Sequence, residues 1–313
     1  GKTLVIGSRE SALAVIQTKI VMTYLEENHP EIRLRLETMK TTGDRILDRR
    51  LDEIGGKGLF VKELDQALRE ERIDLSVHSM KDMPVEMPED LPVIGYSRRE
   101  DPRDVLVLPA GIKQEELSDD NALREYLNAG RPIGTSSGRR VLQLQEIFPN
   151  VRFESVRGNV ATRLRKLDEG QYGALILASA GLKRLGLENR ISRYFEVDEV
   201  IPSAGQGILA LQGRRGEDYS CLDGFCDTES AFATAAERAY VRALGGGCTS
   251  PIAAHTAFAW EEAGAVMTLR GFYYDEVKQK AFRKQAQNFV RSVEDCARAG
   301  KDLAEEILAE AHG

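Results

Sequence analysis

The sequence predicts a two-lobed α/β protein with a small α+β domain at its C-terminal end. The chain has 313 residues, about twice the length of one typical domain, so we expect two or three domains. A pattern of strand, Gly-hydroxyl turn and helix occurs twice, at residues 3–24 and again at 131–144. After Gly213 this alternation gives way to one long helix and a group of strands. Two similar lobes would face each other across a cleft.

Each lobe is predicted as strand, helix, strand, helix, strand, an order that favours parallel sheets. In the first lobe these segments are expected at residues 3–6, 13–24, 32–36, 61–71 and 73–78. In the second lobe they are expected at residues 131–133, 141–144, 151–153, 160–169 and 174–178. The repeated order is the main reason to expect two lobes of one kind.

Two linkers join the predicted lobes. Residues 97–104 are charged and interrupted by Pro102, as expected of a first crossing. A second crossing is expected near residues 201–205, after which the apolar run 208–211 returns to the first sheet. The last part is predicted to hold a helix, three strands and a second helix, at residues 228–244, 252–260, 266–274, 279–282 and 293–310.

Composition excludes several classes of protein. The formal net charge of −7 argues against a general nucleic-acid or anionic-membrane binder. No apolar run reaches the roughly 18 residues that cross a bilayer, and the first residues enter a strand without a signal segment. Four cysteines are too few for a disulfide framework. We expect a cytoplasmic protein and a monomer, with no nucleic-acid or membrane partner.

Basic residues are concentrated in one stretch. Residues 131–195 hold twelve Lys or Arg against five acids, a net charge of +7, whereas the rest of the chain carries −14. Ten of the twelve are Arg, whose planar guanidinium suits bidentate contacts with carboxylates or phosphates. The alternative is a solvated basic face, which the charge count alone does not exclude.

Several of these residues fall where α/β sheets bind ligands. Ligands lie beyond the carboxyl ends of the strands, where turns and helix N-termini attract anions. The two Gly-hydroxyl turns and two later strand-to-helix junctions carry Ser8, Arg9, Ser11, Thr135, Ser136, Ser137, Arg139, Arg140, Arg157, Arg163, Lys183 and Arg184. An acidic ligand in the cleft would meet them, although the hydroxyls can also serve as helix N-caps.

Lys81 and Asp82 follow directly after the buried strand at residues 73–78. At the carboxyl end of a strand this pair is placed for acid–base work or for stabilising a charge. An Asp before Met-Pro is also a common turn residue. His78 is expected to pack or hydrogen-bond at the strand end, and we assign it no catalytic role.

Cys248 follows three glycines, so its thiol is accessible for covalent attachment or nucleophilic work. The alternative for a lone cysteine is a structural role. The spacing of Cys221, Cys226, Cys248 and His255 lacks the paired units of a zinc site, so we expect no metal. Residues 41–58 are long, charged and bounded by glycine, which is typical of a lid over a site.

Five motifs are spread along the chain in a definite order. They are residues 56–64 (GKGLFVKEL), 78–82 (HSMKD), 156–164 (VRGNVATRL), 181–186 (GLKRLG) and 246–248 (GGC). Together they resemble the porphobilinogen deaminase (hydroxymethylbilane synthase) family over essentially the whole chain. Because several long motifs occur together, the resemblance is far more specific than any single glycine pattern.

The resemblance implies a fold, a cofactor and a reaction. The fold is two lobes arranged like type II periplasmic binding proteins plus a third domain, over residues 1–97 with 205–222, 103–200 and 226–313. The cofactor is a dipyrromethane joined to Cys248 through a thioether. The reaction is the head-to-tail condensation of four porphobilinogen molecules with loss of ammonia, giving linear hydroxymethylbilane in tetrapyrrole (haem) biosynthesis. Each ring carries an acetate and a propionate, which a basic cleft would bind.

The resemblance also implies roles for single residues. Asp82 would be the catalytic residue, holding pyrrole N–H groups and stabilising a cationic azafulvene-like intermediate. Lys57 would belong to the lid. The incoming substrate would be held by Arg9, Ser11, Arg157 and Arg163. The cofactor or the growing chain would be held by Cys248, Lys81, Asp82, Ser137, Arg139, Arg140, Arg163 and Arg184.

Gly138 departs from the family's pattern, which usually has a bulky apolar residue between the paired serines and the paired arginines. A glycine loosens this turn, which leaves the placement of Arg139 and Arg140 open. The competing class is a two-lobed binding protein for an acidic metabolite, without catalysis. Cys248 and the adjacent Lys81 and Asp82 favour an enzyme, because a receptor needs none of them.

Overall fold

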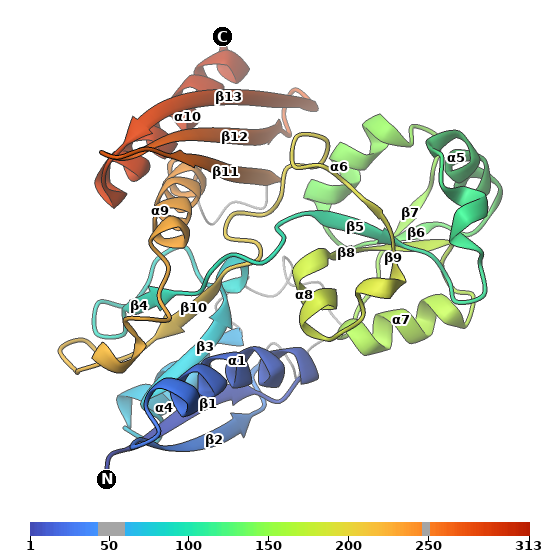
Figure 1. Ribbon diagram of the computed structural model, residues 1–313. Coiled ribbons are helices and arrows are strands. Elements are labelled where there is room, and N and C mark those ends of the chain that lie inside the picture. The colour runs from blue at the N-terminus through green and yellow to red at the C-terminus, as the bar shows by residue number, and fades with distance from the viewer. Residues whose placement is uncertain (43–59, 246–250) are drawn as a thin grey trace.

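The computed structural model describes residues 1–42, 60–245 and 251–313, and it shows two α/β lobes and a smaller third domain (Figure 1). The chain crosses from the first lobe to the second and later returns, and the third domain packs against these crossings. In the described part of the chain, no helix combines the length and the apolar character that a membrane span requires.

The first lobe is built on a five-stranded sheet with the order β2-β1-β3-β10-β4. Its strands are β1 (Thr3–Arg9), β2 (Arg33–Met39), β3 (Leu75–Ser79), β4 (Val93–Tyr96) and β10 (Leu209–Gln212). The sheet packs against helix α1 (Ala12–Asn28), which buries Val21 and Leu25 against strand residues such as Ile6 and Leu75. Helix α4 (Lys62–Arg69) buries Leu64 and Leu68 in a second cluster.

The second lobe repeats this plan with the order β7-β6-β8-β5-β9. Its strands are β5 (Asp104–Val107), β6 (Ile133–Gly134), β7 (Phe153–Glu154), β8 (Ala174–Ala178) and β9 (Ile191–Tyr194). Its helices are α5 (Asp120–Ala129), α6 (Gly138–Ile147), α7 (Val160–Asp168) and α8 (Ser179–Arg184). Leu123 of α5 and Leu144 of α6 pack in one core cluster, while Leu164 of α7 packs in another.

The sheets are mixed, so the prediction of parallel sheets was wrong in part. In the first lobe β1 pairs in parallel with β2 and β3, and in the second lobe β6 pairs in parallel with β7 and β8. β10 and β5, however, pair antiparallel with both of their neighbours. Each of these two strands enters its sheet from the other lobe, and so runs against the strands already there. The repeated strand order and the double crossing give two α/β lobes of one kind beside a smaller third domain, which confirms the predicted architecture.

The third domain combines a three-stranded antiparallel sheet with two helices. These elements are α9 (Thr228–Ala243), β11 (Ile252–Trp260), β12 (Ala265–Asp275), β13 (Lys280–Val290) and α10 (Val293–His312). The predicted end of β13 at residue 282 was wrong, because the strand continues for eight more residues. Residues 283–289 are mostly polar and partly exposed, so the strand is held by its pairing with β12 rather than by an apolar pattern.

One buried carboxylate joins the third domain to both crossings. Glu237 of α9 is fully buried and accepts hydrogen bonds from Arg99 Nη1 at 2.7 Å and Nη2 at 3.0 Å. It also accepts from the backbone N–H of Gly205 at 2.9 Å and from Thr256 Oγ1 at 2.6 Å. Arg99 lies on the first crossing and Gly205 on the second. The third domain is therefore fixed to the hinge between the lobes.

Candidate active site

A cavity of about 800 Å³ lies between the two lobes. Its walls come from α1 and the ends of β1 and β3 in the first lobe, and from α6, α7 and α8 in the second. Sites for small molecules commonly have volumes of roughly 300 to 1,000 Å³. The charged residues of the described chain that line it are Arg9, Lys81, Asp82, Arg139, Arg140, Arg157, Arg163, Arg184 and Glu276.

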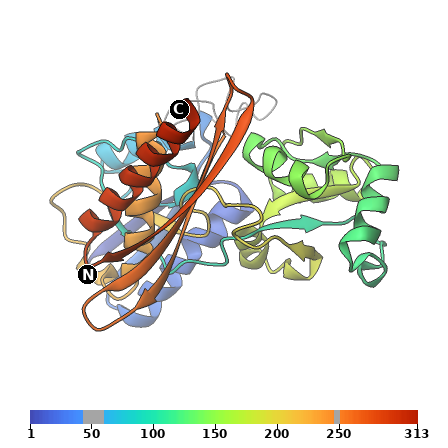
Figure 2. The same ribbon diagram turned by 90° about the horizontal axis from the view of Figure 1, so that it is seen from above.

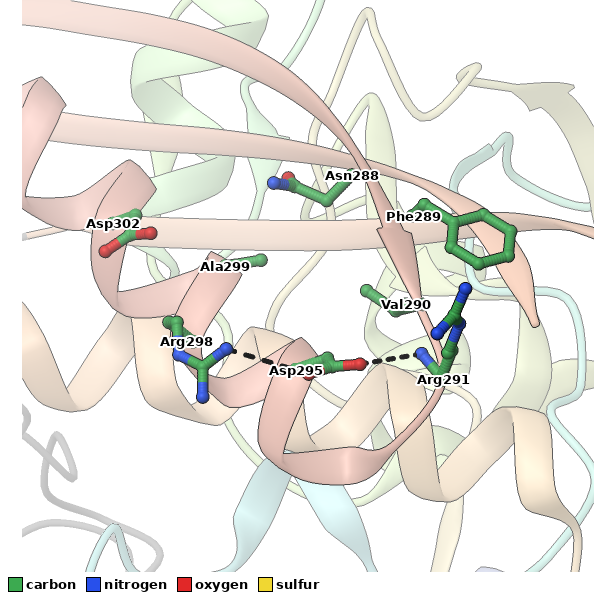
Figure 3. Close-up of a pocket in the computed structure, with 8 residues that line it drawn as sticks. All are labelled: Asn288, Phe289, Val290, Arg291, Asp295, Arg298, Ala299 and Asp302. Atoms are coloured by element: carbon green, nitrogen blue, oxygen red, sulfur yellow. Dashed lines mark hydrogen bonds and ion pairs between the residues drawn. The ribbon is translucent and has the colours of Figure 1, made fainter. Parts of the chain in front are cut away.

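A second hollow of about 270 Å³ lies in the third domain, between the end of β13 and the start of α10 (Figure 3). Asp295 accepts a hydrogen bond from the backbone N–H of Arg291 at 2.9 Å and forms an ion pair with Arg298 at 3.7 Å. Its carboxylate is therefore occupied by its neighbours. We assign no ligand to this hollow.

Lys81 and Asp82 reach the cavity because the residues on either side of them are buried. Met80 and Met83 are both almost completely buried, and the Met80 N–H donates to the carbonyl of Ile208 at 2.8 Å. The short turn that follows β3 is closed by a bond from the Met83 N–H to the Met80 carbonyl at 3.1 Å. The turn thus holds Lys81 and Asp82 at the carboxyl end of the strand, as the sequence predicted.

Burial lowers the pKa of Lys81 to about 8, although the nearby Asp82 opposes this shift. Arg140 and Arg139 lower the pKa of Lys81 further, because they are cations from the opposite wall. Lys81 is therefore a cation whose charge is lost only slightly above neutral pH. A bound carboxylate would hold that charge in place.

Arg9 and Ser11 lie where β1 passes into α1. Ser11 is the N-cap of α1, because its Oγ accepts from the backbone N–H of Ala14 at 3.3 Å. The Arg9 guanidinium lies over the Phe60 ring, 4.2 Å from its centroid. Both Arg9 and Phe60 line the cavity. The ring thus orients this cation at the edge of the first lobe.

Arg139 and Arg140 are fixed by a carboxylate behind them. Asp104 is fully buried and accepts from Arg139 Nη1 at 2.6 Å and from Arg140 Nε at 3.1 Å. The two guanidiniums hold the pKa of Asp104 well below its ordinary value, although burial alone would raise it. Arg139 also donates to the carbonyl of Ile201 and Arg140 to that of Ile176. The arginine pair is therefore rigid.

The turn that carries this pair is capped although position 138 is glycine. Ser137 is the N-cap of α6 and accepts from the backbone N–H of Arg140 at 3.2 Å, so the first turn is anchored despite Gly138. A Cβ at position 138 would lie 3.2 Å from Pro251 of the third domain. Gly138 therefore lets the third domain approach the start of α6 closely.

Arg157 and Arg163 lie at the start of α7. Asn159 is the N-cap, accepting from the backbone N–H of Thr162 at 2.9 Å. Gly158 has a φ of +106°, and a Cβ there would come within 2.7 Å of Thr162, so this turn requires glycine. Arg163 Nε donates to the Gly158 carbonyl at 2.8 Å. Burial, with Arg140 nearby, lowers the pKa of Arg163 to about 10, a value at which it remains a cation at neutral pH.

Arg184 connects the two lobes directly. Its Nη1 donates to Gln17 Oε1 of α1 at 3.1 Å, and its Nη2 donates to the carbonyl of Gly207 on the second crossing at 2.7 Å. Gln17 Nε2 in turn donates to Ser79 Oγ at 3.2 Å. A side chain of the second lobe is thus held by the first lobe across the cavity.

The structure brings most of the predicted site residues together around one cavity. Those that line it are Arg9, Ser11, Lys81, Asp82, Arg139, Arg140, Arg157, Arg163 and Arg184. Ser137 is absent from the lining and serves as a helix cap. Lys57, most of the predicted lid and Cys248 lie outside the described residues. Phe60 and Pro251, each three residues further along the chain, do line the cavity.

The sequence analysis missed Asp104, Gln17, Gln206 and Glu276. Asp104 was counted within a linker, and it is the first residue of β5. Gln206 donates from Nε2 to the carbonyl of Pro102 at 2.7 Å and to Asp104 Oδ1 at 3.1 Å, which ties one crossing to the other. The available signal was the Asp-Pro-Arg-Asp run at residues 101–104, because this run ends the first crossing and its last residue begins β5.

Only part of the basic stretch serves the cavity. Five of its twelve Lys and Arg residues line the cavity, counting the described residues. Others form ion pairs elsewhere, as Arg190 does with Asp168 at 2.8 Å and Arg193 with Asp120 at 2.8 Å. Lys183, expected beside Arg184 in the cleft, instead pairs with Asp101 at 3.1 Å. The net charge of this stretch therefore overstates the charge that a ligand meets.

Comparisons with known proteins match nearly the whole chain to one family. The family model for the dipyrromethane cofactor binding domain of porphobilinogen deaminase matches residues 4–221, and the model for its C-terminal domain matches residues 231–309. The porphobilinogen deaminase of Ruminiclostridium cellulolyticum is 49% identical over 308 residues, which cover 95% of this chain and 99% of that protein. That of Alkaliphilus oremlandii is 53% identical over 270 residues, which cover 86% of each chain.

Among solved structures, the effector-binding domain of BenM with benzoate has a TM-score of 0.41 and 15% identity, covering 80% of this chain and 96% of that domain. A similarity at this level carries no argument about function. The family models and the curated relatives, by contrast, extend over nearly the whole chain. The chain belongs to the porphobilinogen deaminase family.

Proposed function

We propose that this protein joins four porphobilinogen molecules head to tail, with loss of ammonia, and releases linear hydroxymethylbilane. One observation carries the proposal: a single cavity between the lobes gathers seven cationic side chains around Asp82. Porphobilinogen and each ring of the growing chain carry two carboxylates, which such a cavity binds. A binding protein without catalysis is the competing class, and family membership does not favour it.

The residues fit a dipyrromethane cofactor, which would supply the primer for chain growth when bound. Its two rings carry four carboxylates. A guanidinium has five N–H donors, and three bonds occupy Arg139 and three occupy Arg140, so each retains two donors for a ligand. Lys81 and Arg184 face the same space. Pro251, three positions after Cys248 in the sequence, lines the cavity, and this supports attachment at Cys248.

Asp82 would act on the substrate's pyrrole ring. Its carboxylate can accept a hydrogen bond from a pyrrole N–H, and it opposes the positive charge that develops on the ring as ammonia leaves the aminomethyl carbon. Arg9, Ser11, Arg157 and Arg163 would hold the substrate's acetate and propionate meanwhile. These groups bind and orient the substrate, while Asp82 stabilises the charge.

Substitution of Asp82 tests this assignment. Asp82→Asn keeps the size and removes the charge, so turnover should fall on the order of a hundred- to a thousandfold while KM changes little. Asp82→Glu keeps the charge, displaces it by one methylene, and should retain measurable activity. Release of ammonia and formation of hydroxymethylbilane are the measurements. An Asn variant as active as the parent protein would mean that another group carries the charge.

The intact mass of the purified protein tests the cofactor and its attachment. The mass should exceed the value calculated from the sequence by one dipyrromethane. Cys248→Ala should fold, lack this increment and be inactive, because alanine cannot form the thioether. Cys221→Ala is the matched control and should keep both the increment and the activity. An active Cys248→Ala protein would exclude Cys248 as the attachment site.

We also propose that residues 1–97 with 205–222, 103–200 and 226–313 are the three domains, and that the protein works as a cytoplasmic monomer. The strand orders and the two crossings support these boundaries. The net charge of −7 supports a protein without nucleic-acid or anionic-membrane partners. Light scattering during size-exclusion chromatography should give the mass of one chain, and a dimer mass would contradict the monomer.

A further inference from the structure

Two carboxylates line the cavity among the described residues, and only one of them has been given a role. They are Asp82, in the first lobe, and Glu276, in the third domain. Seven cations line the same cavity, as expected for a site that binds carboxylates. A second carboxylate there repels such ligands and weakens their binding. The same carboxylate attracts a ligand group that carries a positive charge.

Glu276 begins the turn of residues 276–279 that joins β12 to β13. The turn is held from within, because Asp275 Oδ1 accepts from the backbone N–H groups of Val277 at 3.0 Å and Lys278 at 3.2 Å. Lys278 Nζ also donates to the carbonyl of Ala311 at the end of α10. The Glu276 side chain is exposed and has no hydrogen bond or ion pair with any residue that the structure describes. It is available to a ligand.

This turn lies at the end of the third domain that faces the second lobe. The backbone N–H of Tyr274 donates to the carbonyl of Pro251, which also lines the cavity, at 3.2 Å. Arg283, near the start of β13, forms an ion pair with Glu146 of α6 at 3.0 Å. Figure 2 shows the hairpins of the domain at opposite ends of its long strands. Glu276 therefore stands where the third domain borders the cavity.

One chemical group distinguishes an incoming porphobilinogen molecule from every ring that is already part of the chain. The monomer carries two carboxylates and an aminomethyl group, which is protonated near neutral pH. A ring that has been joined to the chain has lost its aminomethyl nitrogen as ammonia, and its carboxylates are then its only charged groups. An ammonium group is thus the mark of a fresh monomer.

We propose that Glu276 recognises the ammonium group of the incoming monomer and repels ligands that carry carboxylates alone. It is a specificity-determining residue at the border of the cavity, and this role rests on the function proposed above. The carboxylate attracts the monomer's cation and opposes the entry of a ring that lacks it. The free charge of Glu276 thereby favours monomer over product.

The role predicts effects of opposite sign on two ligands. Glu276→Gln should raise the KM of porphobilinogen about two- to fivefold, the size expected for an exposed ion pair. The same substitution should lower, by a similar factor, the inhibition constant of the pyrrole that carries a methyl in place of the aminomethyl group. Both effects should shrink as salt is raised. A general disturbance of the cavity would weaken both ligands together.

Glu262→Gln is the matched control. Glu262 lies in the turn between β11 and β12, at the other end of the sheet, and the 11 residues of β12 put it roughly 35 Å away. This control removes the same charge from the same domain and should change neither constant. If Glu276→Gln changes the KM of porphobilinogen and the inhibition constant of the methyl pyrrole in the same direction, or changes neither, the proposal is wrong. If the parent protein consumes no porphobilinogen, the proposed function is wrong and this role falls with it.

Discussion

Asp104→Ala should destabilise the protein strongly, because it leaves two buried guanidiniums without a counter-charge. Asp104 is fully buried, and Arg139 and Arg140 are each 8% exposed. Removing one member of a buried ion pair typically costs about 3 to 5 kcal/mol, since the remaining charge stays buried and uncompensated. Here two cations lose the same partner. We therefore expect a loss of at least about 3 kcal/mol in the free energy of unfolding.

Urea denaturation followed by circular dichroism measures this loss. Asp90→Ala is the matched control, because Asp90 also makes two bonds to one arginine, Arg69, but the pair is exposed. Its substitution should change the free energy of unfolding far less. Equal losses in the two variants would refute the reasoning, since burial would then not determine the cost.

Asp104 also predicts part of the acid dependence of stability. Its pKa in the folded protein lies below the unfolded value of about 3.9, because Arg139 and Arg140 favour the charged form. The stability it contributes is thus fully present above about pH 4 and is lost as the pH falls further. The free energy of unfolding of the Asp104→Ala variant should therefore depend less on pH below 4 than that of the parent protein.

Three further predictions concern the cations and the hinge. Arg157→Leu and Arg163→Leu should each lower kcat/KM about ten- to a hundredfold, because each removes charge-assisted bonds to a substrate carboxylate; unchanged kinetics would leave them as surface charges. The pKa of Lys81 is about 8 in the empty cavity and rises when a carboxylate binds beside it, so kcat/KM should fall as the pH rises above 8, and Lys81→Arg should move this limb to higher pH; an unmoved limb would assign it to another group. Glu237→Ala should lower the free energy of unfolding by about 3 to 5 kcal/mol, because Arg99 and three further donors lose a buried carboxylate; a loss below 1 kcal/mol in denaturation would contradict this.

Local patterns in the sequence predicted the elements that bury one regular face. The alternation in β2 is visible in a short window, and the N-cap at Ser11 marks the start of α1. The face that α1 buries includes the polar Gln17 and Thr18 beside Val21 and Leu25, so the apolar residues alone did not show it. The far half of β13 has no such pattern, because its side chains are mostly polar and its stability comes from pairing with β12. Strand direction in β5 and β10 depends on which lobe supplies the strand, which no local window contains.

The residues of the candidate site also fall into those that local sequence could place and those that it could not. Residues that follow a strand directly, such as Lys81 and Arg157, could be placed from the sequence, because the end of the strand fixes their position. Asp104 could not, since its partners Arg139 and Arg140 are 35 and 36 positions away and belong to another element. Glu276 could not either, because only the packing of the third domain brings it to the cavity.

The affinity of the cavity for its ligands depends on the protein's own carboxylates as much as on its arginines. Unopposed cations would attract a completed chain, which carries two carboxylates on every ring, more strongly than they attract one monomer. Asp104 reduces the charge of the Arg139 and Arg140 pair from two to one, while its hydrogen bonds keep their remaining donors directed and rigid. Arg184 donates two hydrogen bonds within the protein, one to Gln17 of the first lobe and one to Gly207 of the second crossing. The donors that Asp104 leaves free on Arg139 and Arg140 are therefore fixed in direction, while the positive charge that opposes release of an anionic ligand is lowered by one.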